Sequence, residues 1–276
     1  MIDKHLVKIT LRPFLYALFI SIGFFGLILT LEFSDGRSFI PMSVILYVLV
    51  AFELYSTANH YHIFHKKNTD AVYEFEDHRI IQYAHHAILP TMLYIGLVLF
   101  LFYHNEPSLY FLILLTTFVL FFILFENIHS FYKHKFSLNK STHYIYDIVT
   151  IVLTFLSSAG LLELNSNTSA KTSSLFIVFI SILVILNLLT ISRHLITKST
   201  FIGAIVTSIM LGVIFYLNTF GFVSTLLLAF IVAVIEYGFI SVINELLDGK
   251  DVSKEEILEY LILVMLLTSL VLLNIS

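Results

Sequence analysis

Long apolar runs recur along the whole 276-residue chain, and they restrict its fold more than any other feature. A run of about twenty residues crosses a hydrocarbon core roughly 30 Å thick when it forms a helix, because each residue adds about 1.5 Å. Only 12% of the residues are charged, whereas about 25% are charged in a typical soluble domain. The sequence therefore predicts an all-α, multi-pass integral membrane protein.

The apolar runs predict about nine transmembrane helices, with eight as the alternative. They cover residues 14–31, 40–58, 81–103, 108–127, 144–163, 174–192, 201–217, 221–243 and 257–274. The longest polar segments between them, 59–80 and 128–143, are too short to fold alone. We therefore expect one transmembrane domain over residues 1–276 and no separate soluble domain.

Positive charges are distributed unevenly between the two sides that alternating spans create. Of the 15 Lys and Arg residues, all except Arg37 and Lys171 fall on the side of the N-terminus, including Lys4, Lys8 and Arg12. Short loops rich in Lys and Arg stay in the cytoplasm. The N-terminus is therefore predicted to be cytoplasmic, in a protein of the cell (plasma or inner) membrane.

The composition also excludes several classes of function. Cysteine is absent, which rules out disulfides, thiolate metal sites and a cysteine nucleophile. The formal net charge is −4, whereas a nucleic-acid-binding surface needs an excess of Lys and Arg. We therefore expect membrane lipids as partners, and no nucleic acid.

Two neighbouring predicted helices carry small residues at every fourth position. These residues are Ala204, Ser208 and Gly212 in the first helix, and Thr225, Ala229 and Ala233 in the second. Small residues let two helices approach closely in lipid, so a tight antiparallel hairpin is predicted. Glu236 continues the second stripe and is expected to face protein rather than lipid.

Ionisable side chains lie just inside the predicted cytoplasmic ends of several helices. Spacings of three, four or seven residues place pairs of them on one helical face. A charged carboxylate in hydrocarbon costs about 2.5–3.5 kcal/mol, so such residues usually turn inward and find partners. The candidates are Glu53, His60, His85, His86, Glu126, His129, His143, Asp147 and Glu236.

Carboxylates and neutral imidazoles are ligands of zinc and non-haem iron, and the chain is rich in histidine, with 12 residues. The nine candidates are therefore predicted to form a metal-binding site that faces the cytoplasm. Glu126 and His129 have the Glu-x-x-His spacing of helical di-iron sites, although the motif occurs once. The alternative is an interhelical hydrogen-bond network that holds the bundle together.

Three functions fit this pattern. The first is a metal-dependent membrane enzyme that uses iron or zinc and acts on a lipid-soluble substrate, a lipid or an isoprenoid. The second is a proton- or cation-coupled transporter in which the same residues form a relay. The third is a non-catalytic assembly factor, sensor or subunit. The enzyme is preferred to the transporter here, because the sequence shows no duplication of the kind that transporters commonly carry.

Overall fold

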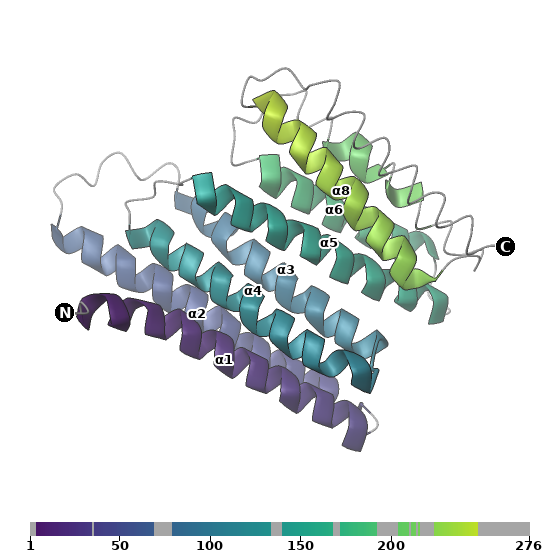
Figure 1. Cartoon of the computed structure of the whole chain (residues 1–276), viewed down its shortest axis with the longest axis horizontal. Helices are drawn as coiled ribbons and strands as arrows, with labels where there is room; N and C mark the ends of the chain where they lie inside the picture. The colour runs from purple at the N-terminus through teal and green to yellow at the C-terminus, as the bar shows by residue number, and fades with distance from the viewer. Residues whose placement is uncertain are drawn as a thin grey trace. The chain divides into compact units, whose positions relative to one another are not determined.

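The computed structural model of the chain is helical throughout the described elements (Figure 1). Its backbone is described for residues 4–34, 36–68, 79–133, 140–167, 172–191, 204–209, 211–213, 215 and 224–247. Its side chains are described for residues 11–34, 36–57, 87–130, 145–167, 174–188, 204–209, 211–213, 215 and 224–238. The predicted all-α fold is confirmed for these parts of the chain.

The described helices overlap predicted spans, and several of them extend beyond the predicted ends. They are α1 Lys4–Phe33, α2 Phe39–Asn68, α3 Arg79–Tyr103, α4 Pro107–Lys133, α5 Lys140–Asn167, α6 Thr172–Ile191 and α8 Thr225–Leu247. Further helical residues lie at 204–209 and 211–213. The ninth predicted span, 257–274, lies outside the described residues.

Within the described residues, four helices are long and apolar enough to cross a membrane. Their apolar stretches are Leu11–Phe33, Phe39–Thr57, Pro107–Ser130 and Ile145–Asn167. Shorter apolar stretches are Ala87–Tyr103, Ser174–Leu188, Ala204–Val213 and Thr225–Gly238. The chain is therefore consistent with a membrane protein.

The chain divides into two compact units, residues 1–145 and 146–276. In the first unit, α1 packs against α2 and α4, and α3 packs against α2 and α4. The buried face of α1 repeats every three or four residues, as a helix with one packed face requires. It consists of Ala17, Ile20, Phe24, Leu27 and Ile28.

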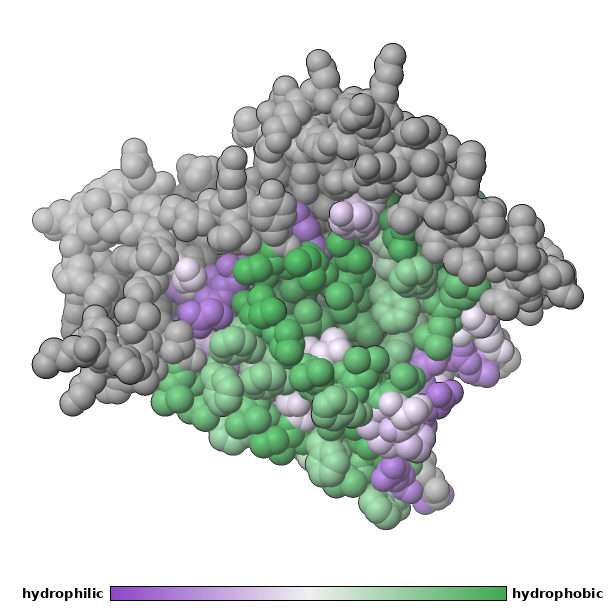
Figure 2. Space-filling model, in the orientation of Figure 1, coloured by the Kyte–Doolittle hydropathy of each residue, from purple (hydrophilic) through white to green (hydrophobic). Residues whose placement is uncertain are grey.

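The outward face of α1 is also apolar, with Leu18, Phe19, Ile22 and Phe25 exposed. Figure 2 shows that apolar side chains also cover much of the coloured surface in this view. Exposed apolar patches of this extent are unusual for a soluble monomer, whereas lipid chains solvate them readily. This surface supports the assignment to a membrane.

Two glycines mark places where helices approach closely. A Cβ atom at Gly23 of α1 would lie 2.3 Å from Leu46 Cδ1 of α2. In the second unit, a Cβ atom at Gly212 would lie 2.9 Å from Phe176 Cε2 of α6. The stripe that contains Gly212 therefore contacts α6, a partner that the sequence analysis does not predict.

Candidate functional site

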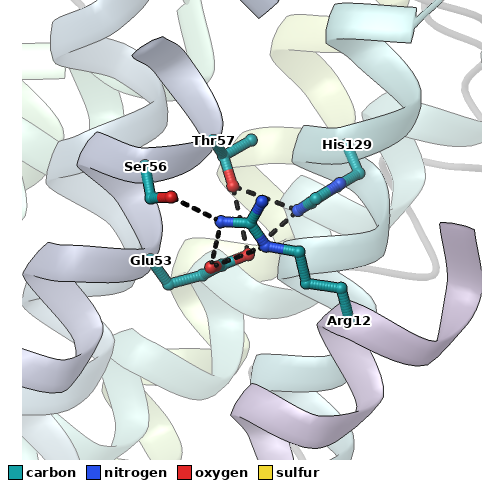
Figure 3. Close-up of polar contacts among 5 residues, drawn as sticks. All are labelled: Arg12, Glu53, Ser56, Thr57 and His129. Carbon is teal, nitrogen blue, oxygen red and sulfur yellow. Dashed lines mark hydrogen bonds and ion pairs between the residues drawn. The ribbon is translucent and has the colours of Figure 1, made fainter. Parts of the chain in front are cut away.

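Five polar side chains from three helices meet in the first unit (Figure 3). Arg12 lies near the start of α1 and His129 near the end of α4, while α2 contributes Glu53, Ser56 and Thr57. The three α2 residues share one helical face, because they are spaced at i, i+3 and i+4. We call this group the Arg12–Glu53–His129 network.

Glu53 is the centre of the network, and its side chain is only 1% exposed. Its Oε2 atom accepts hydrogen bonds from Arg12 Nη2 at 2.9 Å and from Arg12 Nε at 3.2 Å. Its Oε1 atom accepts a hydrogen bond from Thr57 Oγ1 at 3.1 Å and lies 2.9 Å from His129 Nε2. A buried charge is tolerated when it is paired and hydrogen-bonded, and both oxygens of Glu53 meet that condition.

Arg12 holds the network at its more exposed edge. Arg12 Nη2 also donates to Ser56 Oγ at 2.8 Å, and the guanidinium lies 5.7 Å from the centre of the Tyr16 ring. The Arg12 side chain is 32% exposed, compared with 1% for Glu53. Because an arginine keeps its charge at any physiological pH, it supplies a fixed positive charge beside the buried carboxylate.

His129 faces the other oxygen of Glu53, and its side chain is 7% exposed. Its Nε2 atom lies 2.9 Å from Glu53 Oε1 and 3.1 Å from Thr57 Oγ1. An ionised carboxylate only accepts hydrogen bonds, so this contact assigns a proton to Nε2.

The charge balance of the network favours a proton over a metal as its ligand. Arg12 and Glu53 cancel each other, so the network is neutral while His129 is neutral. A divalent cation on Glu53 would meet the guanidinium that already occupies Oε2. Like charges at such short range repel strongly, and more so in a buried site.

Of the nine predicted site residues, the structure brings Glu53 and His129 together. Glu126 lies one turn before His129 on α4, and its Oε2 atom is buried without a hydrogen-bond partner among the described residues. Asp147 and Glu236 belong to the second unit. The side chains of His60, His85, His86 and His143 lie outside the described set.

The described side chains contain no group of three His, Asp or Glu residues that could hold a metal ion. Because four of the nine candidates are not described, the metal site stays a prediction. Sequence reasoning missed Arg12, which it treated only as part of the cytoplasmic charge. The predicted topology could have identified the partner of Arg12. The start of the first span and the end of the second lie on the same side of the membrane, which places Arg12 near Glu53.

In the second unit, the prediction that Glu236 faces protein is confirmed, because Glu236 is fully buried. Two other fully buried polar residues are Asn187 of α6 and Ser208, and Asn187 Nδ2 donates to Ser208 Oγ at 3.2 Å. Asn187 belongs to α6, which packs against α8, the helix that carries Glu236. This second polar group is therefore built from side chains of different helices, as the first one is.

Comparison with known protein families gives one match, over residues 16–274, to a family described as protein of unknown function (DUF5656). The matched region contains Glu53 and His129 and begins after Arg12. Neither a curated protein nor a solved structure matches the chain.

Proposed function

The chain belongs to the DUF5656 family, and we propose that it is a polytopic protein of the cell membrane that couples transport to proton movement. One observation carries this proposal: His129 and Glu53 lie 2.9 Å apart in a buried site next to the fixed charge of Arg12. Carboxylates and histidines inside a membrane commonly form proton relays in pumps and transporters. We prefer this function to the metal-dependent enzyme because Arg12 competes with a metal for Glu53.

Each residue of the network has a distinct role in the proposed relay. When it is protonated, His129 passes its Nε2 proton to Glu53 Oε1. Arg12 stabilises the anionic form of Glu53 whenever the proton is on His129. Thr57 keeps the two groups aligned, because its hydroxyl contacts both Glu53 Oε1 and His129 Nε2.

We further propose about nine spans, with the N-terminus in the cytoplasm. The network supports alternation of the first four spans, because it joins the start of α1 to the ends of the apolar stretches of α2 and α4. Three of the four shorter apolar stretches lie in helices of 25, 20 and 23 residues, namely α3, α6 and α8. At about 1.5 Å per residue, each of these helices is about as long as a hydrocarbon core is thick.

Single cysteines test this orientation directly, because the chain contains no cysteine of its own. A membrane-impermeant maleimide is expected to label Ser38→Cys and Glu106→Cys in intact cells, since both positions are exposed between helices on the predicted outer side. Ser137→Cys, in the opposite connection, is expected to react only after permeabilisation. Labelling of Ser137→Cys in intact cells, with Ser38→Cys protected, would show that the orientation is the opposite of the one proposed.

Proton flux into liposomes tests the proposed function. Purified protein is reconstituted with a pH-sensitive dye inside the vesicles, and a potassium diffusion potential drives protons inward. We expect a protein-dependent flux that Glu53→Gln and His129→Asn both abolish, because each removes one proton-exchanging group. The metal-dependent enzyme would be favoured instead by stoichiometric iron or zinc that is lost in Glu126→Ala and His129→Ala.

A further inference from the structure

A fully buried carboxyl group without a hydrogen-bond partner lies in the second unit. Glu236 of α8 is 0% exposed, and neither of its oxygens makes a hydrogen bond among the described residues. Asn187 of α6 is also 0% exposed, and its Oδ1 atom likewise has no partner within the described part of the chain. Three buried acceptor oxygens thus lie on α6 and α8, two helices that pack against each other.

The hydrogen bonds around Asn187 fix which of its atoms remains free to accept. Ser208 Oγ donates its proton to the backbone oxygen of Ala204 at 2.7 Å. Ser208 must therefore accept at Oγ, and Asn187 Nδ2 is the donor at 3.2 Å. This assigns the Asn187 amide orientation and leaves Oδ1 available as an acceptor.

Glu53 and Glu236 are both almost completely buried, but they differ in the polar and charged side chains around them. Glu53 has an arginine, a histidine and a hydroxyl group as partners. The described residues 174–188 of α6, which packs against α8, contain no titratable or charged residue, and neither do residues 204–209 and 211–213. Glu163 of α5 bonds to Thr225, which precedes Glu236 by eleven residues, about 16 Å along α8.

We propose that Glu236 is a proton-binding site of the second unit and is held there as a neutral carboxylic acid. An anion at this position would be buried without a compensating charge, which is strongly unfavourable in a low-dielectric interior. A bound proton removes that charge and supplies a donor, and we assign the unpartnered Asn187 Oδ1, on the adjoining helix α6, as its acceptor. This inference concerns the second unit alone and does not depend on proton movement through the Arg12–Glu53–His129 network.

A proton satisfies this site better than a metal cation. The described site offers three unpartnered oxygen atoms, whereas calcium takes six to eight oxygen ligands and magnesium requires six. A proton requires only one donor and one acceptor. The site therefore has the composition expected for binding a proton.

A lipid-soluble carbodiimide tests the protonation state in the reconstituted full chain. The acid proton moves to a carbodiimide nitrogen while the carboxyl oxygen bonds to the central carbon, so the reagent adds without a leaving group. We expect dicyclohexylcarbodiimide to label Glu236, and the label to decrease as the pH rises. Glu163 is the matched control, since its carboxylate accepts from Thr225 and Asn167 and should stay unlabelled.

Infrared spectroscopy gives a second measurement that does not require reagent access. The carbonyl band of a protonated carboxylic acid is expected in the wild type and is expected to be lost in Glu236→Gln. Asn187→Leu should shift this band to higher frequency because the acid loses its acceptor, whereas Asn127→Leu, a buried asparagine of the first unit, should not.

Three results would overturn the inference. The first is the absence of both the label and the infrared band. The second is equal labelling of Glu163 and Glu236, and the third is protection of Glu236 by sodium or potassium at constant pH. None of them bears on the liposome flux of the His129 and Glu53 variants, so failure of this inference is distinguishable from failure of the proposed function.

Discussion

Replacing Arg12 by leucine is expected to lower the free energy of unfolding by about 3 kcal/mol. Glu53 stays buried, but its Oε2 atom loses the hydrogen bonds from Arg12 Nη2 and Nε. Removing one partner of a buried ion pair typically costs 3–5 kcal/mol, and the lower end applies because Arg12 is 32% exposed. Unfolding by sodium dodecyl sulfate in mixed micelles measures the change.

Removing the unpaired charge of Glu53 as well should restore most of the free energy of unfolding that Arg12→Leu loses. In the double variant Arg12→Leu with Glu53→Leu, the apolar pair leaves no uncompensated charge, so it is expected to be more stable than Arg12→Leu alone. Arg37→Leu is the matched control, because Arg37 is exposed and lies outside the network. Equal losses for Arg12→Leu and Arg37→Leu, or a double variant less stable than either single one, would contradict the described ion pair.

Replacing Gly23 by valine is expected to destabilise the packing of α1 on α2 by about 1–3 kcal/mol, the usual cost of overpacking a well-packed site. A Cβ atom there would lie 2.3 Å from Leu46 Cδ1, 2.9 Å from Cδ2 and 3.1 Å from Cγ. The whole end of the Leu46 side chain must therefore move. The same unfolding measurement in mixed micelles determines the loss.

A neighbouring glycine provides the control for this prediction. A Cβ atom at Gly26 would meet Met42 Cε at 3.4 Å, an ordinary contact, so Gly26→Ala should be tolerated. Shortening the opposing side chain in Gly23→Val with Leu46→Ala should recover part of the stability. A Gly23→Val variant as stable as the wild type would contradict the close approach of α1 and α2 at this position.

The positions of the helices could be predicted from hydropathy because a membrane-spanning helix must be apolar along its length. The ends of the helices were less predictable. α2 continues to Asn68 and α4 to Lys133, beyond the predicted ends at 58 and 127. Hydropathy detects the apolar part of a helix, and a helix can continue into polar sequence once its hydrogen-bond ladder is established.

The site was predictable only in part, because helical spacing shows which residues share a face but not which helix that face meets. The depth of Glu53 and His129 made both of them candidates, and the structure pairs them across 76 residues of sequence. Helical spacing also places Glu53 on one face with His60, seven residues away, whose side chain lies outside the described set. Arg12 was missed because its partner is 41 residues away.

Comparing two buried histidines of the first unit is the most direct test of the central claim. His129 lies in the network, whereas His104 lies just after the end of α3, and both are less than 10% exposed. The account predicts that His129→Asn loses the protein-dependent proton flux in liposomes, while His104→Asn retains it at equal reconstitution. Flux that persists in His129→Asn, or is lost equally in both variants, would contradict a role for the Glu53–His129 pair in proton movement.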